Sequence, residues 1–479
     1  MKARLFTAEN RKWWTLVAVA VGRFMIMLDN TVVNVALPSI QSDLGMSPSE
    51  LEWVFNAYAL TFGVLLLSGG KLADMLGRRR IFIAGLVIFT AASLWCGLAA
   101  GAASLIAART VQGIGAALMN PATLSIITAT FPPRQRGTAI GIWAGVSALA
   151  LAIGPLLGGL LTEDIGWSWI FFINIPVGIA GVLAARIFID ETRDMSREQR
   201  LDLPGLITSA LGLFALTYGL IETNDHAWGS PRVLTLFAVA VVALASFVLL
   251  ELRQRNPMLD MSLFRNPTFS GANTVMFFVG LAMFGIFYYN SLYLQRVLGY
   301  GAIKTGATFL PLTVLIILVA PAAGKLSDRI GPRWLMGGGM ILLSTSLLLF
   351  GTLGVSSTWW DIVPGLVVAG FGMGITMAPT TAAAMGSVPV DKAGVGSAVI
   401  NSMRQVGGSL GIAIMGALLA TSVSVAPLDP RYPAEFVPGY HRALNVGAAI
   451  LLAGAVIAVV TVRKTRPAEQ IAAEPVVGA

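Results

Sequence analysis

Long apolar runs dominate the hydrophobic pattern of this chain, and short polar segments separate them. A run of about 17 or more apolar residues is long enough to cross the hydrocarbon core of a bilayer as an α-helix. The pattern therefore predicts an all-α membrane protein with 14 transmembrane helices. They are expected at residues 13–37, 51–70, 81–100, 104–130, 138–161, 170–189, 204–221, 233–250, 270–294, 305–323, 334–354, 362–385, 394–421 and 443–462.

The composition agrees with a chain that lies mostly in lipid. Only 12% of the residues are charged, against about a quarter in soluble domains, and the mean hydropathy is +0.77. A soluble globule is therefore excluded. The single cysteine, Cys96, and the two histidines, His226 and His441, which fall in predicted loops, argue against disulfide, zinc or redox chemistry. We therefore expect no cofactor and no metal site.

Basic residues indicate which side of the membrane each loop faces. The net charge is +8, but Lys and Arg cluster at the ends of the predicted helices, so they are interpreted as topology signals and no nucleic-acid partner is expected. The positive-inside rule places both termini in the cytoplasm and predicts a multi-pass protein of the cell (plasma or inner) membrane. Of the 32 Lys and Arg, the outer loops then hold only Arg232, Arg296, Lys304, Arg431 and Arg442.

One motif occurs twice in the chain. Residues 70–79 read GKLADMLGRR, and residues 324–333 read GKLSDRIGPR. The GIG-to-Pro pattern at 113–121 is likewise echoed by GMG-to-Pro at 372–379. Such agreement in register indicates an internal repeat.

The repeat predicts two six-helix bundles of the parallel type. Residues 1–189 would form the first bundle and residues 270–479 the second, with a short tail. Residues 190–269 would form an inserted helix pair with its flanking loops. In transporters built from such repeats the substrate site lies near the bilayer midplane, between the halves. The organisation therefore indicates alternating access.

The repeated motif has a physical explanation. Glycine permits a tight turn, aspartate can cap or pair with a helix end, and arginine holds the turn at the lipid surface. A basic anchor would explain the arginines alone, whereas the recurrence of Asp and Gly in register favours a latch that breaks and reforms between conformations. The residues expected in this latch are Gly70, Asp74, Gly77, Arg78, Asp328 and Arg333.

Four segments carry a resemblance to a known family. They are LDNTVVNVALP at 28–38, the motif that begins at Gly70, RTVQGIG at 109–115, and the glycine- and proline-rich stretch from Gly145 to Gly159. With these segments the chain resembles the fourteen-helix drug:proton antiporter family of the major facilitator superfamily. The resemblance covers the whole chain, and it implies export of lipophilic, often cationic compounds in exchange for protons.

The expected function is therefore transport and not enzymatic catalysis. We expect a bacterial multidrug antiporter, a monomer in the lipid bilayer, that exchanges protons for small lipophilic compounds of monocationic or neutral amphiphilic character. The sequence has no P-loop motif, so ATP is not the implied energy source. A transporter of lipids, lysolipids or secondary metabolites, or a proton-coupled importer, would use the same fold. A membrane enzyme is disfavoured because the predicted helices lack a buried His and paired acids.

Asp29 is the expected proton carrier. A charged side chain inside a membrane helix is costly and suggests a function. Arg109 lies at a similar predicted depth in the helix at 104–130. An acid whose surroundings alternate between wet and dry, with an arginine nearby, can bind and release a proton. A static ion pair that locks two helices is the alternative.

Polar side chains recur on one face of two predicted helices, at 104–130 and at 394–421. They are expected to line a substrate cavity, although hydrogen bonds between helices would also explain them. Apolar and aromatic side chains would complete the wall. The expected cavity residues are Met25, Asn30, Asn34, Asn56, Tyr58, Gln112, Asn120, Phe278, Tyr289, Asn290, Met377, Asn401, Arg404 and Gln405.

Three further positions bear on cargo and motion. Asn56 is an amide where some members of the resembled family carry a second acid, so divalent cations are not expected. Arg23 is unusual for that family, and either extends toward the inner surface or contacts an anionic group of the cargo. Gly154 and Pro155 permit close helix approach and a bend, which predicts a hinge, with a packing seam as the alternative.

Overall fold

The computed structural model describes residues 8–46, 48–193, 202–223, 226–254, 257, 259–423 and 429–463, and over these residues its only regular structure is helical. The first helices are α2 (Ala8–Leu44), α3 (Pro48–Leu76), α4 (Arg78–Gly97), α5 (Ala102–Thr130), α6 (Pro133–Asp164), α7 (Trp169–Phe172), α8 (Asn174–Phe188), α9 (Leu203–Glu222) and α10 (Pro231–Arg253). The remaining ones are α11 (Pro267–Leu292), α12 (Ala302–Thr308), α13 (Leu310–Ile330), α14 (Arg333–Phe350), α15 (Trp359–Gly386), α16 (Ala393–Ala420) and α17 (Tyr432–Thr461). Short helices lie at η1 (Met261–Arg265), η2 (Tyr293–Val297) and η3 (Val390–Lys392).

The predicted class, an all-α membrane protein, is confirmed. Within the described residues, 12 helices are long and apolar enough to cross a membrane. α6 and α16, with 32 and 28 residues, occupy the two other predicted positions, so the order of helices fits the expected 14. Two predicted spans are interrupted: 170–189 divides into α7 and α8, and 305–323 divides between α12 and α13.

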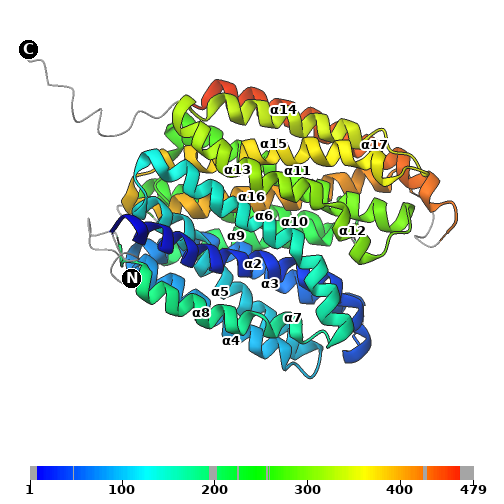
Figure 1. Ribbon diagram of the computed structural model, residues 1–479, viewed down its shortest axis with the longest axis horizontal. Helices are drawn as coiled ribbons and strands as arrows, with labels where there is room; N and C mark the ends of the chain where they lie inside the picture. Colours follow the sequence, from blue (N-terminus) through cyan, green and yellow to red (C-terminus); the bar gives the residue numbers. More distant parts are fainter. Residues whose placement is uncertain are drawn as a thin grey trace, which may run out of the picture.

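The long helices lie side by side along one common direction (Figure 1). We call α2 to α8 the N-terminal group and α11 to α17 the C-terminal group. α4 and α8 lie at one edge of the molecule, and α14 and α17 lie at the opposite edge. The two groups meet where α6 packs against α13 and where α3 packs against α16. Any site between the groups is therefore lined by these central helices and their neighbours.

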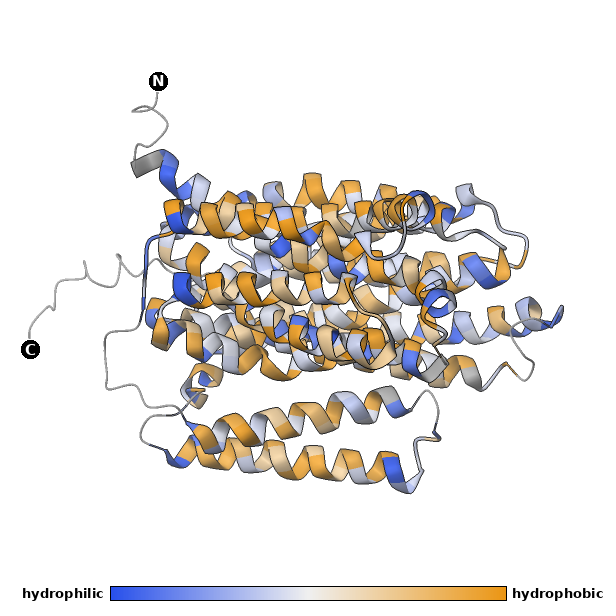
Figure 2. Cartoon of the chain, turned by 90° about the horizontal axis from the view of Figure 1, so that it is seen from below, coloured by the Kyte–Doolittle hydropathy of each residue, from blue (hydrophilic) through white to orange (hydrophobic). Residues whose placement is uncertain are grey.

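Hydrophobic residues predominate along the helices, and hydrophilic residues concentrate toward the helix ends (Figure 2). α10 is the clearest case, since Val241 and Val242 at its middle are 68% and 66% exposed. An apolar surface of this extent requires a lipid environment. α9 packs against α10 and also contacts α3 and α16, which ties the inserted pair to both groups.

Glycines allow close contacts between helices of the N-terminal group. A Cβ on Gly115 of α5 would lie 2.6 Å from the backbone nitrogen of Phe89 and 2.8 Å from the carbonyl oxygen of Gly85, both on α4. Backbone atoms cannot rotate away as side chains do. The small residue is therefore required for the observed α4–α5 separation, as is usual for helices in membranes.

The turn in each copy of the repeated motif spans fewer residues than the sequence suggested, because the first glycine of the motif lies within a helix. Gly70 and Gly324 lie inside α3 and α13, so they do not form a turn. Gly77 and Gly331 form the actual turns, with φ angles of 111° and 91°, which favour glycine. Gly70 and Gly324 instead permit close helix contacts, described below.

We expect Gly115→Val to destabilise the fold, because overpacking of a tight contact costs about 1–3 kcal/mol. The thermal unfolding midpoint of the purified protein in detergent measures this. Gly338→Val on α14 is the matched control, since open space surrounds the position of its Cβ. Equal midpoints for the two variants would show that the α4–α5 contact does not need glycine.

Candidate functional site

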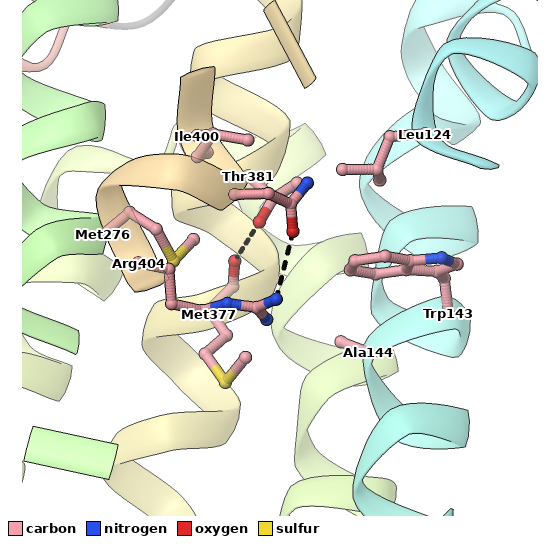
Figure 3. A pocket seen from close by; sticks show the side chains of 9 residues that line it. Leu124, Trp143, Ala144, Met276, Met377, Thr381, Ile400 and Arg404 are labelled. Carbon is pink, nitrogen blue, oxygen red and sulfur yellow. Dashed lines mark hydrogen bonds between the residues drawn. The ribbon is translucent and has the colours of Figure 1, made fainter. Parts of the chain in front are cut away.

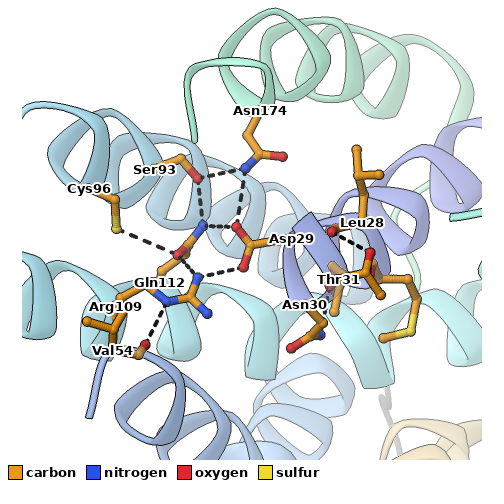
Figure 4. A network of polar contacts seen from close by, with 12 residues as sticks. Leu28, Asp29, Asn30, Thr31, Val54, Ser93, Cys96, Arg109, Gln112 and Asn174 are labelled. Atoms are coloured by element: carbon orange, nitrogen blue, oxygen red, sulfur yellow. Dashed lines mark hydrogen bonds and ion pairs between the residues drawn. The ribbon is translucent and has the colours of Figure 1, made fainter. Parts of the chain in front are cut away.

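Asp29 of α2 is completely buried and lies in a cage of polar side chains (Figure 4). Its Oδ2 accepts a hydrogen bond from Arg109 of α5 at 2.6 Å. Its Oδ1 accepts from Gln112 at 2.8 Å and from Asn174 of α8 at 3.4 Å. Ser93 of α4 accepts from both amides. The carboxylate is thus charge-paired and well hydrogen-bonded.

Arg109 is held by more than its ion pair. Its Nε donates to the carbonyl oxygen of Val54 on α3 at 3.1 Å, and its guanidinium lies 4.3 Å from the ring centroid of Tyr58. Arg109 has no exposed surface. The Asp29–Arg109 pair therefore connects α2, α3 and α5, and it lies within the N-terminal group and is sealed from solvent in this conformation.

Asp74, near the end of α3, connects the two groups. Its Oδ1 accepts from the backbone N–H of Gly394 at 2.9 Å, and its Oδ2 accepts from that of Val395 at 3.0 Å. These N–H groups lie in the first turn of α16, where a carboxylate is favoured by the helix dipole. Arg78 donates to Asp74 at 3.0 Å and also to the carbonyl oxygen of Val390. We call these contacts the Asp74 latch.

The second copy of the motif makes a related contact. The carboxylate of Asp328 on α13 lies against Gly137, near the start of α6, where its Oδ1 would meet a Cβ at that position, and its Oδ2 is buried without a hydrogen-bond partner among the described residues. Close glycine pairs support both contacts. A Cβ on Gly70 would lie 2.4 Å from the carbonyl oxygen of Gly394, and one on Gly324 would lie 2.1 Å from that of Gly137.

The two copies differ in one respect. Arg78 has no counterpart in the second copy, where Pro332 stands at its place. Arg333, which matches Arg79, lies with its guanidinium 5.0 Å from the ring centroid of Trp334. The first contact is therefore reinforced by an ion pair, and the second consists of the close approach of Gly324 and Asp328 to the start of α6.

A surface ion pair lies close to the Asp74 latch. Lys392, at the end of η3, donates to Asp260 at 2.6 Å. Partial burial raises the pKa of Asp260, but hydrogen bonds from Lys392 and Ser262 outweigh this effect and lower that pKa to about 2. The stabilisation by the charged form is present above the ordinary pKa and is lost only as the pH falls through about 2. The carboxylate of Asp260 therefore adds no pH dependence near neutral pH.

Gly154 of α6 lies directly against α2. A Cβ at this position would meet the hydroxyl of Thr31, two residues after Asp29. Close contact of α2 and α6 therefore occurs beside the buried ion pair. The ring of Pro155 lies outside the described side chains.

A small cavity lies between the two groups (Figure 3). Its volume is about 10 Å³, close to the minimum that holds one water molecule, so this conformation has no room there for a lipophilic substrate. Leu124, Trp143 and Ala144 face it from α5 and α6. The opposite wall comes from α11, α15 and α16 and consists of Met276, Met377, Thr381, Ile400, Asn401 and Arg404.

Three residues expected in the cavity, Met377, Asn401 and Arg404, line this one. The others lie elsewhere. Gln112 belongs to the Asp29 cage, Tyr58 packs on Arg109, and Asn120 accepts a hydrogen bond from Arg23. Tyr289 donates a hydrogen bond to the carbonyl oxygen of Ile412, and Asn290 accepts one from Tyr440. Asn30 donates to the carbonyl oxygen of Ile26 in its own helix. Phe278 lies near Gly454, and Met25 is buried. Asn56 and Gln405 are half-buried, and the side chain of Asn34 lies outside the described part.

Sequence reasoning missed several contacts of these sites. Asn174 and Ser93 complete the Asp29 cage, and Trp143 forms part of the cavity wall. Glu191 accepts from the backbone N–H groups of Arg79 and Arg80, beside the turn at Gly77. No spacing rule links these residues to their partners. Only the polar character of Asn174 and Ser93 inside apolar runs was visible as a signal.

Comparison with known proteins places this architecture in a family. The Major Facilitator Superfamily model matches residues 19–412. The tetracenomycin C resistance and export protein of Streptomyces glaucescens is 37% identical over 421 residues, which are 87% of this chain and 77% of that protein. The multidrug resistance protein Stp of Mycobacterium tuberculosis (strain CDC 1551 / Oshkosh) is 36% identical over 420 residues, with the same coverage of 87% and 77%.

A solved structure shows the same fold. The proton:xylose symporter XylE aligns with a TM-score of 0.68 at 12% identity, over 96% of this chain and 98% of that chain. The chain belongs to the major facilitator superfamily. It is a multi-pass membrane transporter, similar to drug-resistance and export members of that family, and the resemblance inferred from its motifs is confirmed.

We expect Asp74→Asn to loosen the latch, because hydrogen bonds to a charged group contribute about 1.5–3 kcal/mol, and a neutral amide keeps only part of them. A change of this size raises the open population about tenfold or more. The measurement is the maleimide labelling rate of a cysteine at Ser397, which is buried about one turn beyond Gly394, in a Cys96→Ser background.

Asp361→Asn is the control for the latch experiment. Asp361 is exposed and caps the start of α15, where it accepts from Thr358. This variant should label at the native rate. A native labelling rate in Asp74→Asn would contradict the role of Asp74 in closing this end.

Proposed function

We propose that the chain is a proton-coupled antiporter that exports lipophilic small molecules by alternating access. Export is supported by the relatives, one of which is a tetracenomycin C resistance and export protein and another a multidrug resistance protein. Proton coupling is supported by one observation, the fully buried Asp29–Arg109 pair at 2.6 Å. Asp29 is the acid whose protonation would cancel a charge inside the N-terminal group.

Coupling requires that protonation change how helices pack. A neutral Asp29 would release the guanidinium of Arg109, which also holds the carbonyl oxygen of Val54 on α3. α3 contacts α16 through the Asp74 latch, and α2 contacts α6 through Thr31 and Gly154. α6 in turn packs against α13. Loss of one ion pair would thus act on the α3–α16 contact through α3, and on the α6–α13 contact through α2 and α6.

The sequence supports an orientation and a division of the chain for this cycle. We propose that the latch end faces the cytoplasm of a bacterial cell, with both termini on that side, because the basic residues concentrate there. Residues 1–189 and 270–479 would move as two bundles around the cavity, with residues 190–269 inserted between them. Gly154 and Pro155 would serve as a hinge beside Asp29.

The lining of the cavity bears on the kind of cargo. Leucine, isoleucine, tryptophan and two methionines provide a wall for an aromatic or aliphatic body. The charged side chain among the lining residues is Arg404. The sequence led us to expect monocationic or neutral amphiphilic cargo. A monocation would face the charge of Arg404 without a carboxylate from the lining residues, so neutral and anionic amphiphiles fit this cavity better.

A membrane potential of ~100 mV supports a gradient of about 50-fold for each net charge moved. We expect native protein in proteoliposomes to concentrate the neutral probe N-phenyl-1-naphthylamine when a proton gradient is applied. Asp29→Asn should still equilibrate the probe but should not concentrate it. Concentration at the native level by Asp29→Asn would contradict the coupling role.

A stability control separates coupling from a static ion pair. Asp29→Asn leaves the Arg109 charge buried and unpaired, which costs about 3–5 kcal/mol. The double variant Asp29→Asn/Arg109→Gln removes both charges and should recover most of the lost thermal stability. We expect the double variant to remain uncoupled. Recovery of gradient-driven transport together with stability would show that the pair is only structural.

A further inference from the structure

Arg23 of α2 is fully buried close to the cavity. Its Nε donates to Ser147 at 2.9 Å, and one of its terminal nitrogens donates to Asn120. The other terminal nitrogen, Nη2, is buried without a hydrogen-bond partner. These contacts show that Arg23 does not extend along the helix to reach the membrane surface. They leave a positive charge among neutral groups.

Arg404 of α16 is a second buried cation, 7% exposed, and it lines the cavity itself. Its Nη2 donates to Asn401 at 3.0 Å, and its Nε is buried without a partner. The two arginines border the same region, because the Trp143 ring that contacts Arg23 lines the cavity together with Arg404. Both therefore have unused hydrogen-bonding capacity in the same region.

No acid compensates these two charges. In the part of the chain that the structure describes, no ion pair includes Arg23 or Arg404. Arg109 provides the contrast, because Asp29 neutralises it directly. Buried charges in membrane helices are normally paired or face a functional cavity. An anion between the two arginines would supply the missing partner.

The cavity wall indicates what carries the anion. The ring of Trp143 lies 4.4 Å from the guanidinium of Arg23 and forms part of the cavity wall. Met276, Met377 and Ile400 add apolar surface beside Arg404. A simple inorganic ion would not need such a wall, whereas an aromatic or aliphatic body would pack against it.

We propose, on the basis of the export function proposed above, that this cavity binds the anionic group of an amphiphilic cargo. Arg404 contacts the anion directly, and Arg23 supplies a second positive charge from behind Trp143. The cargo enters when the groups separate, since the present volume of about 10 Å³ admits only a particle the size of water. The cargo class is thus an aromatic or aliphatic compound with one negative charge.

The test compares two probes that differ by one charged group. 1-Anilinonaphthalene-8-sulfonate is anionic, and N-phenyl-1-naphthylamine is its neutral counterpart. The ratio of anionic to neutral transport is measured in phosphatidylcholine proteoliposomes that contain the full chain. We expect Arg404→Gln to lower this ratio about tenfold, because it removes a charged hydrogen bond to the sulfonate. Arg23→Gln should lower it less, and Arg404→Lys should retain part of it.

Arg431→Gln is the matched control, because Arg431 is exposed and pairs with Asp429 away from the cavity. It should keep the native ratio. If the native protein transports neither probe, the export proposal fails. If native protein transports the neutral probe and Arg404→Gln leaves the ratio unchanged, the anion site alone is overturned.

Two further arms distinguish the source of the anion. Chloride is replaced by gluconate, and phosphatidylglycerol is added to the vesicles. An Arg404-dependent requirement for chloride would assign the site to an inorganic ion and overturn the proposal. An Arg404-dependent requirement for phosphatidylglycerol would assign the site to a lipid phosphate, and this result would also overturn the proposal. Independence from both supports the cargo as the source.

Thermal stability provides a readout that does not depend on transport. Without ligand, Arg404→Gln should raise the unfolding midpoint, because it removes a buried charge that no described acid pairs with, at the expense of one hydrogen bond. The anionic probe should stabilise the native protein more than the variant. A lower midpoint for the ligand-free variant, with equal stabilisation by the probe, would show that Arg404 is only a structural residue.

Discussion

The constraint that governs this structure is the cost of charge inside a lipid-embedded helical protein. Asp29 and Arg109 satisfy it by pairing, and Gln112 and Asn174 occupy the remaining hydrogen-bonding capacity of the carboxylate. The pair is therefore stable only while both charges are present. In the proposed cycle, a proton delivered to Asp29 would remove one of them, and the partners of Arg109 would then rearrange.

The consequences of that event depend on contacts far from it along the chain. Asp74 holds the first turn of α16, and glycine pairs bring α3 to α16 and α13 to α6. The contacts of Asp74 with α16 are hydrogen bonds from backbone N–H groups, which can break when the two groups separate. Arg23 and Arg404 contrast with the Asp29 pair, because neither forms an ion pair within the described residues and each has one buried nitrogen without a hydrogen-bond partner there.

The sequence predicted the helices well, because apolar runs report directly on the lipid environment. It also predicted that Asp29 and Arg109 lie at a common depth, and that the Asp74 motif meets a helix end. It could not predict that Gly70 lies inside α3, because the sequence alone does not distinguish a glycine that permits close helix packing from one that forms a turn. On the polar face of α5, Gln112 contacts Asp29 whereas Asn120 contacts Arg23. Helical periodicity predicts which residues share a face, but it does not predict which residues of other helices they contact.

The most direct test of the account is the number of protons released when cargo binds. Purified protein in weakly buffered solution with a pH indicator is mixed with saturating cargo, and the same is done with Asp29→Asn. The account predicts that the native protein releases about one proton per chain and that the variant releases none. Equal proton release by both proteins would show that Asp29 is not the coupling acid.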